Sequence, residues 1–305
     1  MLIVRKILIW CGISVFFNVT FYPAIMMAAE KELPASQDIS STSTGTIMST
    51  STGTNASAIG RWIAQKNVEE PALSVNEPMY FVLGKEGGDT DARFQLSVKY
   101  RLFEDDGDVV RHAPFLERLT VAYTQTTLWN LEANTDKMQT NFRPSLFWEF
   151  RKPQQIGVLP SFLRFGYEHE SNGESEEKHR GIDTVFIFPA WKTQVWGRDL
   201  FAGVKLYDYL RKDDNNSDIE KYRGYWDVYA RYGNEDSWLV DGIWRWGTGN
   251  HNMVQLDISY PLAKGILSRT GLYLYVQGFY GYGETLYRYN EKTDACVKFG
   301  LAVVR

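Results

Sequence analysis

A histidine and a serine two residues apart are the side chains in this sequence whose types and spacing suggest catalysis. Leu163, Phe165 and Tyr167 alternate with charged or small residues, and His169 and Ser171 continue this apolar series. In an extended strand, residues two apart project on the same side, so the imidazole and the hydroxyl would point together. An imidazole that takes the hydroxyl proton makes a serine nucleophilic. A histidine and a serine at a strand end are also often only solvated, so the spacing by itself leaves both interpretations open.

The segments that must position this pair read as β-strands, because apolar and polar residues alternate from Pro78 onward. In the segment 92–102, one face is apolar and the other carries charged or polar side chains, namely Arg93, Gln95, Ser97, Lys99 and Arg101. We expect twelve such strands, at 78–84, 91–103, 115–129, 138–150, 160–170, 182–195, 199–210, 221–233, 236–246, 251–262, 270–281 and 292–304.

Alternation alone fits a soluble sandwich with its apolar face inward as well as a membrane barrel with that face outward. The apolar segments run about ten residues, which suits a tilted strand that crosses a bilayer. Aromatic residues cluster near segment ends, as an interfacial girdle requires, namely Trp129, Trp148, Trp191, Trp196, Trp226, Trp244 and Trp246. Backbone groups in lipid must all be paired, so such a sheet has to close. The sequence therefore predicts an all-β fold, a transmembrane antiparallel β-barrel of twelve strands.

The connections between these segments predict the two ends of the barrel. Membrane barrels of this kind have short periplasmic turns and longer external loops. The long charged connections 104–113, 171–181 and 211–220 are therefore expected outside. Short connections such as Gly233-Asn234-Glu235 are expected as periplasmic turns.

The chain divides into three regions. Residues 1–29 read as a secretory signal peptide, because a short basic start precedes a mostly apolar run that ends in small residues. An uncleaved membrane anchor is the alternative for this segment. Residues 30–75 contain a Ser/Thr/Gly-rich tract and are predicted to be a flexible lead-in. Residues 76–305 are predicted to form the barrel.

Composition excludes several classes of protein. The 305 residues include 33 Lys and Arg against 37 Asp and Glu, a formal net charge of -4, so no global electrostatic attraction favours nucleic acid as a partner. The two cysteines cannot build a disulfide scaffold. Beyond the first segment, no apolar run reaches the length of a membrane helix.

The stretch around the histidine and serine resembles a known active site. It reads Gly166-Tyr167-Glu168-His169-Glu170-Ser171-Asn172-Gly173 and is similar to that of the outer membrane phospholipase A family, a twelve-stranded barrel of the bacterial outer membrane. Collinear stretches resemble other parts of that family, namely Phe94-Gln95-Leu96-Ser97, Tyr123-Thr124-Gln125, Thr140-Asn141-Phe142, Asp213-Asp214-Asn215, Ser259-Tyr260-Pro261 and Gly281-Tyr282-Gly283-Glu284. The resemblance covers about residue 78 to the C-terminus.

This resemblance implies a role for each polar residue near the predicted strand end. Ser171 would be the nucleophile and His169 the general base. The family orients its histidine with an asparagine twelve residues after the serine, and Asp183 holds that position here. A carboxylate there can accept the imidazole N–H, and the spacing favours this role; the alternative is a residue that begins a strand and caps the preceding loop. The backbone N–H groups of Ser171 and Gly173 are expected to bind the oxyanion.

The same resemblance implies calcium as a cofactor. The family binds the ion through main-chain carbonyls and a serine hydroxyl in this loop, with a carbonyl from a second subunit. The matching positions are Glu174, through its carbonyl, and His179, where the serine is expected. Calcium prefers hard oxygen ligands, and imidazole is a poor substitute. The acidic run 174–177 favours a cation nearby, but it also fits a solvated loop.

The family resemblance further implies a reversible homodimer. Gln125 lies among apolar residues on the predicted lipid face, and an amide there is costly unless it pairs across a two-fold interface or reaches water. The sequence thus predicts a calcium-assisted, dimeric phospholipase of the A1/A2 type, embedded in the outer membrane, that hydrolyses acyl esters of phospholipids. A non-catalytic outer membrane barrel, either a narrow channel or a relative with a decayed site, is the alternative.

Overall fold

The computed structural model describes residues 58–133, 138–262 and 271–304. The predicted signal peptide and the first part of the predicted lead-in lie outside these residues. The chain forms two units, residues 1–66 and residues 67–305. Of the first unit, residues 58–66 are described, and they contain the short helix α3 (Ala58–Ala64), which falls within the range predicted as a lead-in. No helix among the described residues is long and apolar enough to cross a membrane.

The second unit consists mainly of antiparallel strands joined by short helical turns. The helical turns are α4 (Asp108–His112), η1 (Pro114–Leu116), η2 (Glu176–Lys178), η3 (Asp214–Asn216) and α5 (Glu220–Arg223). The strands are β1 (Leu73–Val75), β2 (Met79–Glu86), β3 (Asp89–Arg101), β4 (Leu119–Asn130), β5 (Met138–Arg151), β6 (Phe162–Ser171), β7 (Gly181–Val195), β8 (Arg198–Lys212), β9 (Trp226–Gly233), β10 (Leu239–Trp246), β11 (Asn252–Pro261), β12 (Tyr273–Tyr282) and β13 (Lys292–Val304).

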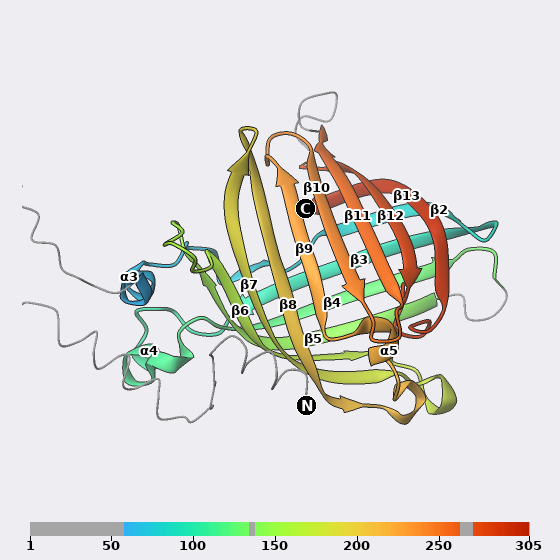
Figure 1. The fold of residues 1–305 in the computed structure, drawn as a ribbon, viewed down its shortest axis with the longest axis horizontal. Helices are drawn as coiled ribbons and strands as arrows, with labels where there is room; N and C mark the ends of the chain where they lie inside the picture. Colours follow the sequence, from blue (N-terminus) through green and yellow to red (C-terminus); the bar gives the residue numbers. More distant parts are fainter. Residues whose placement is uncertain (1–57, 134–137, 263–270, 305) are drawn as a thin grey trace, which may run out of the picture. The chain divides into compact units, whose positions relative to one another are not determined.

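The sheet closes on itself, as the twelve-strand prediction requires. Each strand from β2 to β13 pairs with the next along the chain, and β13 pairs with β2. Within the described residues these twelve strands form one antiparallel barrel, whose wall is seen in Figure 1. The short β1 pairs with β3 beyond the end of β2, so it extends that edge rather than adding a wall strand. The predicted fold class is confirmed.

The two faces of the wall are inverted relative to a soluble protein. On β13, Phe299 is 60% exposed, whereas its neighbour Lys298 is 1% exposed. The same split places apolar side chains on the outside of the other strands, among them Leu83, Leu96, Leu146, Val185, Ile187, Val254, Leu256, Ile258 and Leu274. A soluble sandwich would bury this apolar face. The exposed apolar band instead fits a wall that faces lipid.

One of the predicted loop placements is wrong. The segment 104–113 lies at the same end of the barrel as the turn after Gly233, whereas the segment 171–181 lies at the opposite end with 211–220. In an up-and-down barrel, consecutive connections alternate between the two ends. The connection that contains 104–113 is therefore fixed at the end where the turn after Gly233 lies, however long and charged it is.

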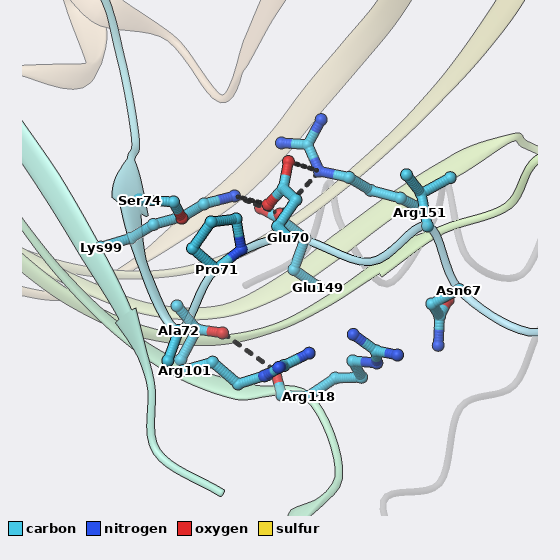
Figure 2. Close-up of a pocket in the computed structure, with 12 residues that line it drawn as sticks. Asn67, Glu70, Pro71, Ala72, Ser74, Lys99, Arg101, Arg118, Glu149 and Arg151 are labelled. Atoms are coloured by element: carbon cyan, nitrogen blue, oxygen red, sulfur yellow. Dashed lines mark hydrogen bonds and ion pairs between the residues drawn. The ribbon is translucent and has the colours of Figure 1, made fainter. Parts of the chain in front are cut away.

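Ion pairs occupy much of the barrel interior. Near the mouth where β1 lies, Glu70 contacts Lys99 and Arg151, and Lys99 also binds Glu149 at 2.6 Å (Figure 2). Further along, Asp227 accepts two hydrogen bonds of 2.7 Å from Arg245. A cavity of about 490 Å³, lined mainly by polar and aromatic side chains, remains between these pairs. The lumen is thus a polar network around a cavity, the arrangement expected behind a lipid-facing wall.

The pair formed by Asp227 and Arg245 predicts a large stability effect. Its side chains are 3% and 11% exposed, so Asp227→Ala leaves a buried guanidinium without its counter-ion. We expect a loss of about 3–5 kcal/mol in the free energy of unfolding. Urea unfolding of the detergent-folded protein, followed by tryptophan fluorescence, measures it. Asp241→Ala, which removes a partner of Arg231 from a pair whose side chains are 22% and 33% exposed, is the control and should cost about 1 kcal/mol or less. Equal losses would contradict the prediction.

Candidate active site

Two of the predicted catalytic side chains meet across neighbouring strands. His169 on β6 lies directly opposite Asp183 on β7 in the sheet register. Residues paired in this way have adjacent side chains on one face. The ring atom Nδ1 of His169 lies 2.7 Å from Oδ1 of Asp183, a hydrogen-bond distance. Because a carboxylate oxygen accepts, Nδ1–H donates, and Nε2 is left as the atom that can take a proton.

This pair lies on the outer face of the barrel. Tyr167, which shares the face of His169 two residues earlier, is 38% exposed. Glu170 points the other way, into the lumen, where its carboxylate accepts a 2.8 Å hydrogen bond from Arg223. The side chains of His169 and Asp183 are 35% and 16% exposed. The sequence placed them on the lipid-facing side, and the geometry is consistent with that placement.

Tyr167 is a member of the site that the sequence reasoning did not single out. Its hydroxyl donates to Oδ1 of Asp183 at 2.6 Å, the same oxygen that accepts from His169. Two donors thereby hold one carboxylate oxygen, which compensates part of the cost of a charge beside lipid. The signal was present, since Tyr167 lies two residues before His169 and so on the same face.

Ser171 ends β6 on the same side of the strand as His169. Among the described residues, no hydrogen bond joins its hydroxyl to the imidazole. Such bonds are often long in enzymes without substrate. The backbone turns after Ser171 through Gly173, whose φ of +70° favours glycine. A Cβ at Gly173 would lie 2.6 Å from a ring carbon of Phe142, so the chain approaches that ring closely.

The loop from 172 to 180 is held by side chains at its base. Asn172 is buried, its amide donates to the Lys178 carbonyl at 2.7 Å, and its Oδ1 accepts from the Arg180 N–H at 2.9 Å. Asn216, in the later loop, is fully buried and bonds to both the N–H and the carbonyl of Gly181 at 3.1 Å. Sequence reasoning assigned neither asparagine this role, because each acts through main-chain groups, which carry no sequence signature.

The predicted calcium ligands do not fit the ion. Nδ1 of His179 lies 2.9 Å from the Glu174 carbonyl oxygen, so the two groups assigned to calcium bond to each other. Nε2 of His179 lies 2.7 Å from Oδ2 of Asp213. Both ring nitrogens therefore face protein oxygens, and the Glu174 carbonyl already accepts from Nδ1–H. The segment expected to supply the second subunit's carbonyl, 134–137, lies outside the described residues.

Gln125, the predicted dimer residue, lies on the outer face of β4. It is opposite Leu96 on one side and Phe142 on the other. The hydroxyl of Tyr123 donates to Oε1 of Gln125 at 3.0 Å. Part of the amide is therefore already satisfied within one copy of the chain.

Comparison with known proteins agrees with this fold. A family model described as Phospholipase A1 matches residues 62–303. The chain is 31% identical over 177 residues to Phospholipase A1 of Escherichia coli strain K12, covering 56% of this chain and 57% of that protein. It is 29% identical over 206 residues to Phospholipase A1 of Klebsiella pneumoniae, covering 66% of each chain.

Solved structures show the same barrel. The outer membrane phospholipase A of Escherichia coli superposes with a TM-score of 0.63 at 21% identity, covering 76% of this chain and 98% of that chain. The outer membrane phospholipase of Salmonella typhi, described as a dimer with bound calcium, superposes with a TM-score of 0.63 at 21% identity, covering 83% and 99%.

The fold and the outer-face polar cluster define a twelve-stranded membrane barrel of the bacterial outer membrane. The match over residues 62–303 makes the assignment more specific, and the chain belongs to the Phospholipase A1 family. The matched region spans 57% of the length of the first of the curated relatives described above.

The buried amide of Asn216 predicts how the loop beside the site is held. Asn216→Ala removes the acceptor of the Gly181 N–H and one donor to the Gly181 carbonyl. We expect trypsin to cleave the folded protein after Lys178 roughly tenfold faster, since each lost hydrogen bond is worth about 1 kcal/mol. Gln155→Ala, which removes an exposed hydrogen bond at the opposite end of the barrel, should leave the rate unchanged. Equal rates in the wild type and Asn216→Ala would refute this role.

Proposed function

We propose that the protein is an outer membrane phospholipase that hydrolyses acyl ester bonds of phospholipids at the outer face of its barrel. The observation that carries this proposal is the hydrogen bond between His169 and Asp183 on that face, two residues from a serine. Membership of the Phospholipase A1 family supports the same reaction. The lipid ester bond and the polar cluster would both lie near the membrane edge, so the substrate can reach the site without leaving the bilayer.

The first half of the proposed reaction transfers the acyl group to the enzyme. Oγ of Ser171 attacks the ester carbonyl carbon while Nε2 of His169 takes the hydroxyl proton. The carbon–oxygen bond to the glycerol then breaks, and the same proton passes from His169 to the departing alkoxide. Asp183 keeps Nδ1–H of His169 oriented and stabilises the imidazolium between these two steps.

The second half returns the enzyme to its starting state. Water attacks the acyl-enzyme carbonyl and gives one proton to Nε2 of His169. The bond to Oγ of Ser171 breaks, His169 returns the proton to that oxygen, and a fatty acid leaves. In both halves, negative charge collects on the carbonyl oxygen, and the main-chain N–H groups of Ser171 and Gly173 are the proposed donors to it.

Asp183 in place of the family's asparagine requires extra support at this position. A carboxylate beside lipid is costly unless donors surround it. Tyr167 and His169 both donate to Oδ1 of Asp183, at 2.6 and 2.7 Å. We assign Tyr167 the role of a positioning residue that keeps this carboxylate directed at the histidine.

A homodimer is part of the proposal, whereas no reaction step is assigned to calcium. A solved relative is described as a dimer with bound calcium; the dimer is part of this proposal, whereas the contacts of Glu174 and His179 do not fit the ion. Gln125 is the residue we propose at a homodimer interface, where its amide N–H groups would bind a second copy while Tyr123 satisfies its oxygen. No step of the reaction above is assigned to calcium, because the two groups expected to bind the ion, the Glu174 carbonyl and the His179 ring, contact each other.

Replacement of the proposed nucleophile tests the reaction. Ser171→Ala should lower fatty-acid release from phospholipid in detergent micelles by about a thousandfold or more, since no other group can form the acyl-enzyme. Ser175→Ala, which changes a serine in the same loop, should stay within about twofold of the wild type. A sulfonyl fluoride should label Ser171 in the wild type, as peptide mass spectrometry would show. If the wild type and Ser171→Ala release fatty acid equally, the protein is not this hydrolase, and steady bilayer currents would then support a channel.

The role of Asp183 predicts a graded series. Asp183→Asn retains an oxygen that can accept from Nδ1–H of His169, as the family's asparagine does, so kcat should stay within about tenfold of the wild type. Asp183→Ala removes that acceptor, and kcat should fall about a hundredfold or more while KM changes little. The same micelle assay measures both variants. An alanine variant as active as the asparagine variant would show that Asp183 only begins the strand.

A further inference from the structure

The ring of His179 lies between two acceptors beside the proposed nucleophile. One acceptor is the Glu174 carbonyl oxygen, 2.9 Å from Nδ1. The other is Oδ2 of Asp213, 2.7 Å from Nε2. A carbonyl oxygen can only accept, so Nδ1–H donates to it, whereas Oδ2 of Asp213 lies close to Nε2 and accepts no hydrogen bond from the described residues. The ring thus joins the loop 172–180 to the loop that follows β8.

Asp213 lies against the other side of the ring. Its side chain is 12% exposed, and its second oxygen, Oδ1, accepts a 2.7 Å hydrogen bond from Arg211. Its carboxylate also lies close to Gly181, where an added Cβ would be 2.3 Å from Oδ2 of Asp213. Gly181 is the register partner of Ser171 across the β6–β7 pair. The carboxylate therefore anchors the His179 ring one strand away from the serine.

A second contact from the same loop supports this bridge. The amide of Asn215 donates to the carbonyls of Glu176 and His179, at 2.8 and 3.2 Å. The backbone of the loop is thereby tied to the segment 213–217 at several points. The loop has its shape from internal hydrogen bonds and one ring, all of which come from this chain.

We infer that the His179 ring takes the place of the calcium ion in this protein, so that its phospholipase activity does not depend on calcium. The inference rests on the proposed function for the activity, and on the contacts of His179 for the ion. A calcium ion needs six to eight oxygen ligands. At this position it would have to displace the ring from the Glu174 carbonyl and break a contact with a buried carboxylate. An imidazole nitrogen is a poor ligand for calcium.

Direct measurement of ion binding tests the inference without any need for activity. Wild-type protein in detergent micelles, first stripped with EDTA, is titrated with calcium chloride in a calorimeter and heated with calcium or magnesium. We expect no binding heat and the same Tm in both ions, because a ligand stabilises only the state that binds it. Fatty-acid release should change by less than about twofold between calcium and EDTA. A calcium-specific heat or Tm rise that His179→Ala abolishes would overturn the inference, as would release lost in EDTA and restored by calcium.

Two variants test whether the ring holds the loop. His179→Ser, which supplies the hydroxyl expected in the family, and His179→Ala should both lower Tm in EDTA and speed cleavage after Lys178. His112→Ser is the matched control, because His112 is an exposed histidine that bonds a main-chain carbonyl at the opposite end of the barrel. If both His179 variants match the wild type in Tm and cleavage, the ring bridges nothing and the inference fails. A wild type that releases no fatty acid under any condition would instead refute the proposed function, and the binding measurements would stand.

Discussion

Complete pairing of backbone groups is the constraint on which the rest of this structure depends. A strand in lipid has no water to satisfy its N–H and carbonyl groups, so the sheet must close, and here β13 returns to β2. In the closed sheet, the apolar face of each strand is on the outside and the polar face is on the inside. Phe299 and its apolar counterparts face outward, whereas charged residues such as Lys298, Lys99 and Asp227 are buried in the interior. There each charge needs a partner, which the lumen supplies as ion pairs such as that of Asp227 with Arg245.

Because closure and alternation are properties of the pattern, much of the fold could be predicted from the sequence. Strand number, antiparallel order and the outward face of β6 follow from residue types alone. The placement of 104–113 failed because it was argued from length and charge, which are local. Its end of the barrel is set by strand parity, a global property, and the predicted strand count already contained the answer.

In the candidate site, too, the strand residues could be predicted from the pattern and the loop residues could not. His169 and Asp183 could be paired from the sequence, because both lie on adjacent strands of known face. The roles of Asp213, Asn215 and Asn216 could not, since they act on the loop 172–180 from a segment about forty residues later. Loop contacts have no period, and their partners are main-chain groups that any residue offers. The contacts of His179 with Glu174 and Asp213 were also not predicted, because the family resemblance implies a calcium ligand at that position.

The two departures from the family, Asp183 and His179, follow one physical logic. Each places a side chain that can carry charge where the family resemblance implies a neutral one, and each is surrounded by groups from its own chain. Asp183 is held by the donors of Tyr167 and His169, and His179 lies between two acceptors. A charged group with its partners built in costs less at the membrane edge than one left unpaired. Side chains of this chain therefore hold the charged groups of the site in place. The register of β6 and β7 in the closed wall sets His169 opposite Asp183.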